Sequence, residues 1–484
     1  MALRRLNTVH IALFSRDDLH FPTLLQLNNI RRADCPAIWH DARPDWAAYS
    51  TDERAERAAA MALEMLQSYV SPVAVVVSPP KEAAGQAGGG DWDRPVPERE
   101  EDTWFARPLL FRAARFSWSV IRVPRHEPEN LQWVARLPGA ALAAWSRLAV
   151  EVVIRVPRRA PGLVRLLTSL YEAEYAGLDP PRITLDLDSD VGEDVLQIAG
   201  NFVWPPVREA RDMGGRMQSG LVIKRRVKGR DGGEGVLEVF PTEREDGHVL
   251  IFPCDGRLDR RWYYWVAYQT LRLRFDGLNR FKGWAAGVAL APPRGLNESW
   301  LGRGHGEGTA TAHSDAKSAV PSASTARPAF FFQAPTADGM LFFGDAWRAL
   351  QAYSLLRHTP GARLRGNGTA VPKLEPGEAA WLRDARELWD GKGWAALYPP
   401  AGRGSVTLLE RDGDSEGRLG PRWEHGGALD ALLEEDGEER WVGYAGGDVV
   451  RREEWVTAKC AEGEVVGPVG GLGVGEMFCL REEG

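Results

Sequence analysis

The chain has 484 residues and a formal net charge of −7, with 44% hydrophobic and 26% charged residues. This composition is ordinary for globular proteins and excludes a wholly disordered or collagen-like chain. The length allows two or three domains. The negative charge argues against nucleic acid as the main partner, because phosphate binding needs a basic surface.

The first 149 residues divide into three parts. Residues 1–80, to which no role is assigned, contain a predicted helix at 51–69 that is rich in Ala, Glu and Met and begins at capping residues. Gly, Pro and Glu dominate residues 81–102, which predicts a linker. Residues 103–149 contain several tryptophans and are expected to lead into the core.

Neither a membrane-spanning segment nor a framework of disulfide bonds is expected. The chain has no run of 18 apolar residues, and its start has neither the long apolar run nor the cleavage site of a signal peptide. The chain as given is therefore expected to be soluble, with no compartment assigned. The four cysteines show no zinc-ligand spacing, and Cys460 with Cys479 is the pair close enough in sequence to consider as a disulfide.

The pattern sharpens at residue 150. Residues 150–156 are mostly apolar and β-branched, which is typical of a buried parallel strand. Pro161 can open the helix that follows, whose leucines at 163, 166, 167 and 170 share one face. Apolar and polar residues then alternate over 183–187, which indicates a second strand. This strand–helix–strand unit predicts a parallel sheet.

Further elements follow along the chain. Strands are predicted at 248–252 and 283–290, a helix at 260–275, a strand followed by a helix within 329–347, and another helix at 378–389. Between them, residues 302–327 are mostly Gly, Ala, Ser and Thr, which predicts a long loop or a mobile lid. The acidic, glycine-rich residues 401–484 have no assignment.

A set of acidic residues ends the second predicted strand. Asp186, Asp188 and Asp190 alternate with its apolar residues, and Asp194 follows closely. Ligands of parallel α/β sheets bind beyond the carboxyl ends of the strands, where carboxylates accept hydrogen bonds from a ribose or base, or hold a cation. The alternative is a solvated strand end followed by a helix cap.

Two single carboxylates are also candidates. Asp255 follows the predicted strand 248–252, where one carboxylate can hold a metal that bridges a diphosphate, but it also suits a simple turn before Gly256. Asp345 follows another apolar run and is either a general base or the N-cap of a helix. The basic residues 224–226 are either a phosphate contact or a solvated loop.

In this order, the pieces resemble glycosyltransferase family 2 with a GT-A fold, in particular the divergent family-2-like proteins of fungi. The resemblance covers residues 150–400. The residues that carry it are the opening strand and leucine helix, the acidic strand 183–190, the segment 248–255 at the place of an Asp-x-Asp metal motif, the acceptor-side segment 332–347 and the late segment 387–399.

The resemblance implies an α/β architecture. It would be a GT-A-like twisted, mostly parallel sheet flanked by helices, with irregular N- and C-terminal additions. Residues 150–300 would form the nucleotide-sugar-binding half, 301–328 a flexible loop, and 329–400 the acceptor-side half. Many fungal members carry a membrane anchor, which points to the secretory pathway if such an anchor precedes this chain.

The resemblance also implies a reaction. A sugar would move from a nucleotide sugar, such as a UDP-sugar, to a hydroxyl acceptor with inversion. Asp345 would be the base, Asp255 would hold Mg²⁺ or Mn²⁺, and the nucleotide would contact Arg155, Asp186, Asp188 and Asp190.

One departure favours other functions. Pro253 stands where the first acid of the metal motif is expected. A non-catalytic binding or scaffold protein on the same fold is therefore an alternative. A third reading is another nucleotide-using α/β enzyme, such as a nucleotidyltransferase.

Overall fold

The protein is seen here as a computed structural model. The residues that it describes are 7–14, 18–31, 35, 37–77, 106–124, 128–175, 177–206, 220–226, 247–278, 280–292, 329–360, 362–364, 381–399, 408–411, 440–442, 460, 464–466 and 474–481. The predicted linker at 81–102 and the predicted loop at 301–328 lie outside these residues.

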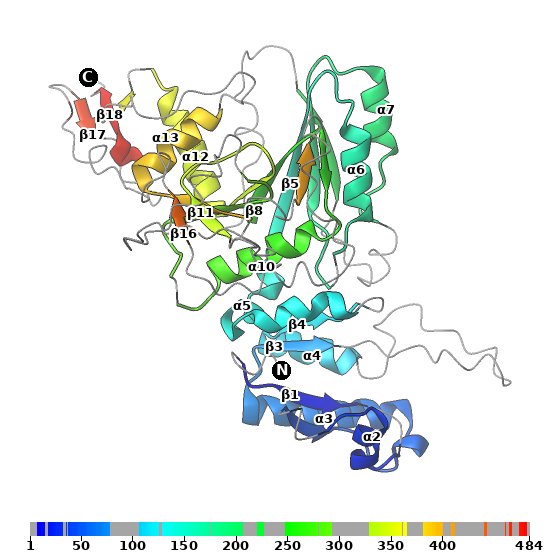
Figure 1. Ribbon diagram of the computed structural model, residues 1–484. Coiled ribbons are helices and arrows are strands. Elements are labelled where there is room, and N and C mark those ends of the chain that lie inside the picture. The colour runs from blue at the N-terminus through cyan, green and yellow to red at the C-terminus, as the bar shows by residue number, and fades with distance from the viewer. Residues whose placement is uncertain are drawn as a thin grey trace, which may run out of the picture.

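The N-terminal part is built from short parallel strand pairs and helices at the lower end of the molecule (Figure 1). Its elements are β1 (His10–Leu13), α2 (Phe21–Leu27), β2 (Ile38–Asp41), α3 (Asp52–Val70), β3 (Ala74–Val77), α4 (Ala106–Phe116) and β4 (Ser119–Arg122). Strand β1 pairs with β2, and β3 pairs with β4. The helix predicted at 51–69 is confirmed as α3, and the side chain of Thr51 caps it by accepting from the backbone N–H of Arg54.

Short helical turns connect this part to the central sheet. They are η3 (Pro128–Arg136), α5 (Gly139–Ala143) and η4 (Trp145–Arg147). Trp133 stacks on Trp145, and both rings are buried in the main hydrophobic core. The Asn7 side chain donates a 2.9 Å hydrogen bond to the carbonyl of Leu137, so the N-terminal part is tied to these turns.

A nine-stranded sheet forms the centre of the protein. Its strands, in spatial order, are β16 (Arg440–Val442), β11 (Phe330–Phe332), β14 (Ala395–Tyr398), β10 (Ala285–Ala289), β12 (Met340–Phe342), β8 (Gly247–Pro253), β5 (Ala149–Val156), β6 (Arg182–Leu187) and β7 (Leu221–Arg225). Five of the eight neighbouring pairs are parallel, so the sheet is mostly parallel. The antiparallel strand β12 lies between β8 and β10.

Helices cover both faces of this sheet (Figure 1). They are α6 (Leu163–Glu172), α7 (Glu193–Asn201), α10 (Trp262–Arg274), α12 (Gly344–Arg357) and α13 (Trp381–Lys392). Val152 and Ile154 of β5 belong to the core that contains α6, α7 and α10. Val153, which points to the other face, belongs to the core of α12 and α13.

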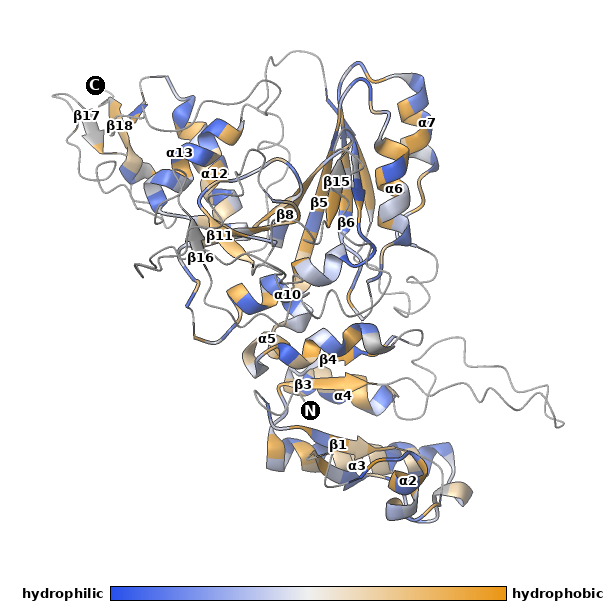
Figure 2. Ribbon diagram, viewed as in Figure 1, coloured by the Kyte–Doolittle hydropathy of each residue, from blue (hydrophilic) through white to orange (hydrophobic). Residues whose placement is uncertain are grey.

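The predicted α/β architecture is thereby confirmed. The sheet is consistent with a GT-A-like fold, and hydrophobic residues are concentrated on its central strands (Figure 2). A helix was expected at 260–275 and is present as α10, with Arg261 as its N-cap. No helix among the described residues is long and apolar enough to cross a membrane.

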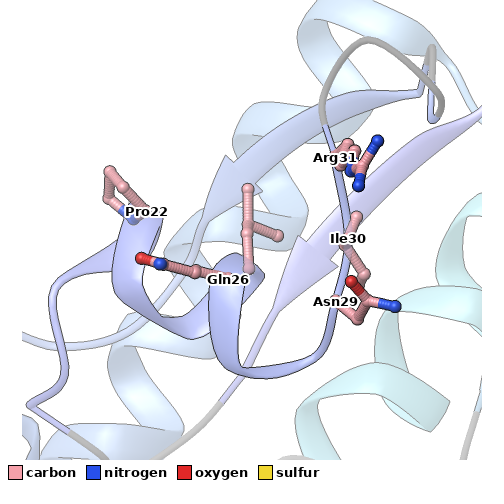
Figure 3. Close-up of a pocket in the computed structure, with 6 residues that line it drawn as sticks. Pro22, Gln26, Asn29, Ile30 and Arg31 are labelled. Atoms are coloured by element: carbon pink, nitrogen blue, oxygen red, sulfur yellow. The ribbon is translucent and has the colours of Figure 1, made fainter.

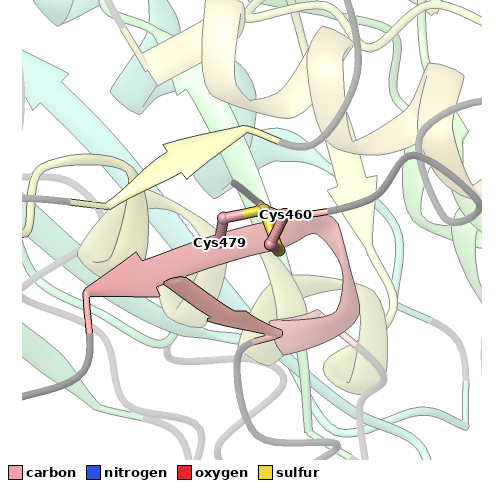
Figure 4. Close-up of a disulfide and its surroundings, with 2 residues drawn as sticks. All are labelled: Cys460 and Cys479. Atoms are coloured by element: carbon pink, nitrogen blue, oxygen red, sulfur yellow. A yellow bond between two sulfur atoms is a disulfide. The ribbon is translucent and has the colours of Figure 1, made fainter. Parts of the chain in front are cut away.

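The C-terminal region contributes to the fold in three places. Strand β16 adds an edge to the central sheet, and β15 (Leu409–Arg411) pairs with β9 (Gly256–Leu258). A three-stranded sheet contains β13 (Arg363–Leu364), β17 (Glu464–Val466) and β18 (Phe478–Arg481), with η7 (Gly475–Met477) just before β18. A disulfide bond joins Cys460 to Cys479 in this sheet (Figure 4), which is the pairing considered from the sequence.

Candidate functional site

Polar side chains meet at the carboxyl ends of β5, β6, β7 and β8. Arg155 of β5 pairs in register with Asp186 of β6 on one side and with Pro253 of β8 on the other. Asp186 in turn pairs with Lys224 of β7. Since these four strands run in parallel, the residues that follow them meet at one edge of the sheet, where α/β proteins bind ligands.

Asp186 is held by an arginine from the end of β7. The Asp186 side chain is 1% exposed, and its two oxygens accept from Nε and Nη2 of Arg226. The backbone N–H of Arg226 donates to the carbonyl of Leu187, which fixes the chain beside β6. The carboxylate of Asp186 is thus already engaged inside the protein, so its direct acceptance of a hydrogen bond from a nucleotide requires Arg226 to move.

Asp188 and Arg155 complete a cluster of alternating charge, the carboxyl-edge cluster of Arg155, Asp186, Asp188 and Arg226. Nη1 of Arg226 lies 3.5 Å from Oδ1 of Asp188, whose side chain is partly exposed. Burial lowers the pKa of Arg155, as does the charge of Arg226, while Asp188 and Asp186 raise it. The cluster therefore holds two guanidinium groups close together, with one carboxylate accessible to solvent.

The remaining acids of this strand end lie further out. Asp190 is exposed, with Oδ2 3.8 Å from Nη1 of the exposed Arg158. Asp194 lies in the first turn of α7, where the helix dipole favours negative charge. These two positions fit the reading of a solvated strand end, in contrast to Asp186 and Asp188.

Asp255 lies in the turn between β8 and β9, not directly before a helix. Its carbonyl accepts a 2.9 Å hydrogen bond from Nη2 of Arg165 in α6. A Cβ placed on Gly162 would lie 2.5 Å from the Cα of Asp255, so only glycine lets the start of α6 approach this turn so closely. The Asp255 turn is therefore packed against the N-terminal end of α6.

The described side chains do not make a metal site on their own. Nowhere in the described part of the chain do three or more His, Cys, Asp or Glu side chains gather as they would around a metal ion. A divalent ion near Asp255 would need most of its ligands from water and from a bound diphosphate, which is how Mg²⁺ commonly binds in nucleotide sites.

Asp345 lies at the opposite end of the sheet. Strand β12 runs antiparallel to β8, and Phe342 pairs with Val249. The backbone N–H of Gly344 donates to Nδ1 of His248, at the start of β8. With about 3.3 Å of rise per residue, the seven-residue strand β8 separates Asp345 from the Asp255 turn by roughly 20 Å.

The contacts of Asp345 explain its position. It lies in the first turn of α12, whose N-cap is Phe343, so the expected N-cap role is wrong. Oδ2 of Asp345 accepts a 2.9 Å hydrogen bond from Nη2 of Arg274, at the end of α10. The expectation that Asp345 and Asp255 serve one reaction centre is not met, because the antiparallel direction of β12 carries Asp345 to the amino end of β8.

A second buried polar group lies between α12 and α13. The Tyr353 hydroxyl donates a 3.0 Å hydrogen bond to Oε2 of Glu387, which is also 3.2 Å from Nε of Arg357. Burial raises the pKa of the nearby Asp384. This group was not predicted from the sequence, although two acids three residues apart on the helix predicted at 378–389 are a usable signal. It fastens the two helices together, away from the carboxyl-edge cluster.

A separate surface pocket lies beside α2 in the N-terminal part (Figure 3). Its lining consists of Pro22, Leu25, Gln26, Asn29, Ile30 and Arg31. Of these residues only Leu25 is buried, and the polar ones are exposed. The pocket thus has no buried polar group that would orient a ligand.

Comparison with known proteins finds a matching family model and similar solved structures. A family described as the SPBC1E8.03c N-terminal domain matches residues 1–86. Among solved structures, the chain is similar to the mannosyltransferase PcManGT from Pyrobaculum calidifontis in complex with GDP-Man and Mn²⁺. The identity is 14%, the TM-score is 0.28, and the similarity covers 56% of this chain and 65% of that one.

These matches bear little on the activity. No curated protein matches the chain. The chain spans slightly less than two thirds of the mannosyltransferase, and a similarity of this score carries no weight in assigning a function. The family match lies outside residues 150–400, so membership of glycosyltransferase family 2 stays a prediction.

Proposed function

We propose that the chain binds a nucleotide sugar at the carboxyl edge of its central sheet and transfers the sugar to a hydroxyl acceptor. The observation that carries the proposal is the carboxyl-edge cluster, with Arg226 between Asp186 and Asp188 and with Arg155 in register beside them. Nucleotides bind at this edge in open parallel sheets.

Each residue of the cluster has a distinct role in this proposal. The two guanidinium groups, Arg155 and Arg226, would meet the diphosphate, because arginine matches phosphate oxygens with paired N–H donors. Asp188 is partly exposed and would accept from the ribose or base. Asp186 is buried and would position Arg226 instead of contacting the nucleotide directly.

A divalent metal would bind together with the nucleotide. Mg²⁺ or Mn²⁺ held between Asp255 and the diphosphate would offset the charge that develops on the leaving group. Since Asp255 is the one acidic ligand that the sequence places there and Pro253 precedes it, we propose that the metal binds weakly without nucleotide.

Asp345 is not part of the proposed reaction centre. Its ion pair with Arg274 and its separation of roughly 20 Å from the Asp255 turn support this exclusion, because a general base must reach the acceptor hydroxyl. We propose that Asp345 instead connects the start of α12 to the end of α10.

The test is a donor screen. UDP- and GDP-sugars are incubated with Mn²⁺ and a panel of hydroxyl acceptors, and release of the nucleoside diphosphate is measured. We expect turnover with one donor class and a loss of roughly tenfold or more in Asp188→Asn, because a neutral amide oxygen accepts from the donor more weakly than a charged carboxylate. Asp190→Asn is the matched control and should behave as wild type, because Asp190 lies outside the cluster.

A non-catalytic binding protein is the second candidate. Pro253 in place of the first acid and the remote position of Asp345 both favour it. Nucleotide binding without turnover of any donor would support this candidate, whereas the absence of both binding and turnover would contradict both functions.

A further inference from the structure

The exposed face of helix α3 carries large apolar side chains at helical spacing. Ala55, Ala59, Leu63 and Leu66 form its buried face. On the other side, Met61 is 70% exposed, Met65 49% and Tyr69 84%. Arg54 and Arg57 continue this exposed face toward the start of the helix. We call Arg54, Arg57, Met61, Met65 and Tyr69 the α3 stripe.

Exposed apolar residues are concentrated in this part of the molecule. Among the described residues, 18 large hydrophobic side chains are exposed, and 11 of them lie between Leu19 and Phe111. Exposed apolar side chains clustered in this way mark interaction surfaces. The N-terminal part therefore offers the surface most suited to a protein partner. It lies away from the top of the central sheet (Figure 1).

We propose that the α3 stripe is a dimer interface, on which α3 of a second copy of this chain packs in the antiparallel direction. The stripe is nearly symmetric about Met61, because Arg57 and Met65 lie four residues to either side of it, and Arg54 and Tyr69 lie seven residues before it and eight after it. In an antiparallel pair, Arg54 faces Tyr69 of the other copy, Arg57 faces Met65, and Met61 lies at the two-fold axis. A two-fold dimer requires a surface of this self-complementary kind.

Charge also fits the antiparallel direction. The last turn of α3, which lies wholly within the described residues, contains no basic residue, while Asp52 and Glu53 occupy its first turn. The C-terminal carbonyls of a helix carry partial negative charge and are stabilised by nearby cations. Arg54 and Arg57 of the second copy would supply these cations, and Arg54 would also reach the face of the Tyr69 ring.

The same charges disfavour an anionic membrane as the occupant. Membrane-surface helices carry a basic polar face, whereas the first turn of α3 is acidic. Glu64, on the flank of the stripe, is bound by Arg112 and Arg115 of α4. Arg112 and Arg115 are therefore engaged within the protein.

The first test is the oligomeric state of the full-length chain by sedimentation velocity over a range of concentrations. We expect a concentration-dependent dimer, whose dissociation constant rises roughly tenfold or more in Met61→Glu, because two like charges meet at the axis. Leu355→Glu, which alters a 73% exposed leucine on α12, is the matched control and should dimerise as wild type. Equal thermal melts of both variants establish that folding is intact.

A charge pair tests the direction of packing. Tyr69→Glu and Tyr69→Lys both remove the ring, so a contact that depends only on apolar area would weaken equally in both. The proposed dimer predicts weaker association for the lysine variant, which faces Arg54, and its recovery in the Arg54→Glu/Tyr69→Lys double variant. Under oxidising conditions, the Met61→Cys variant should also form a disulfide bond between the two copies of residue 61.

Three results would overturn the proposal. These are a monomer at every concentration, equal dimerisation of wild type and Met61→Glu, and equal association of the two Tyr69 variants. Binding of the monomer to anionic lipid vesicles, lost in Met61→Glu, would assign the stripe to a membrane instead.

Discussion

The carboxylate of Asp186 and the guanidinium of Arg226 form an ion pair that joins the end of β6 to the end of β7. The side chain of Asp186 is 1% exposed and that of Arg226 is 21% exposed. A carboxylate removed from water to this extent needs a partner. Arg226 is 40 residues further along the chain. The pair therefore holds Arg226, directly after β7, against the edge where we propose that the nucleotide binds.

Asp186→Asn should destabilise the protein strongly. Removing one member of a buried ion pair leaves the other charge uncompensated, at a cost of about 3–5 kcal/mol. The partial exposure of Arg226 places the expected loss at the lower end of this range. Urea unfolding measures it.

A double variant distinguishes the cost of one unpaired charge from the contribution of the ion pair itself. Asp186→Leu with Arg226→Met replaces both charges by apolar groups of similar size, and such replacements are often neutral. We expect the double variant to be more stable than Asp186→Asn. If Asp186→Asn is as stable as wild type, the ion pair does not contribute to stability as expected.

Asp345→Asn should leave sugar transfer near the wild-type rate. General-base catalysis contributes about 10²–10⁴-fold to a reaction rate. A loss of transfer rate of that size would indicate that Asp345 is the general base after all. The ion pair with Arg274 is partly exposed, with 40% of the Asp345 side chain accessible, and its loss should cost about 0–1 kcal/mol. Initial rates and thermal melts of the same preparation distinguish these outcomes.

The sequence alone predicts the position of Asp186 but not that of its partner, Arg226. The alternation over 183–187 predicts β6 correctly, and the position of Asp186 at its end follows from it. Arg226 was visible only as part of a basic run, because nothing local indicates that a residue 40 positions away lies beside Asp186. That contact depends on β7 pairing with β6.

The position of Asp345 in the sheet was not predicted, for a different reason. The strand and helix around it were predicted correctly, as β12 and α12. The direction of β12 was not predicted, since a three-residue apolar strand has the same pattern whether it runs parallel or antiparallel. This direction decides at which end of the sheet Asp345 lies, so local pattern alone could not define the site.

Asp259 should make stability depend on pH. Burial raises the pKa of Asp259 to about 6, although its hydrogen bond from the backbone N–H of Arg261 opposes this. Between its ordinary pKa near 4 and a pH of about 6, the folded state binds a proton that the unfolded state has released. Stability therefore falls as the pH rises through this window, by about 3 kcal/mol in total.

Asp259→Asn tests this dependence. Asparagine keeps an oxygen that accepts from Arg261 but does not ionise, so the variant should gain on wild type as the pH rises from 4 to 7. The measurement is urea unfolding of both proteins across this range. A difference in unfolding free energy that is the same at pH 4 and pH 7 would contradict a raised pKa.

The disulfide should stabilise the small C-terminal sheet. The bond closes a loop with a sequence separation of 19 residues, for which loss of chain entropy in the unfolded state predicts about 3 kcal/mol. A reducing agent should lower the unfolding midpoint of wild type and leave Cys460→Ser unchanged. If the reducing agent lowers the unfolding midpoint of both proteins equally, the Cys460–Cys479 disulfide is not the source of the stabilisation.

Calorimetric titration with UDP and GDP in the presence of Mn²⁺ tests the central claim most directly. Wild type and Asp345→Asn should bind one of these nucleotides with the same affinity, whereas the Asp186→Leu/Arg226→Met variant should bind at least roughly tenfold more weakly, because it lacks a guanidinium that meets the diphosphate. Without Mn²⁺, wild-type binding should also weaken. Absence of binding by the wild type, or equal binding by all three proteins, would contradict a nucleotide site at the carboxyl edge of the sheet.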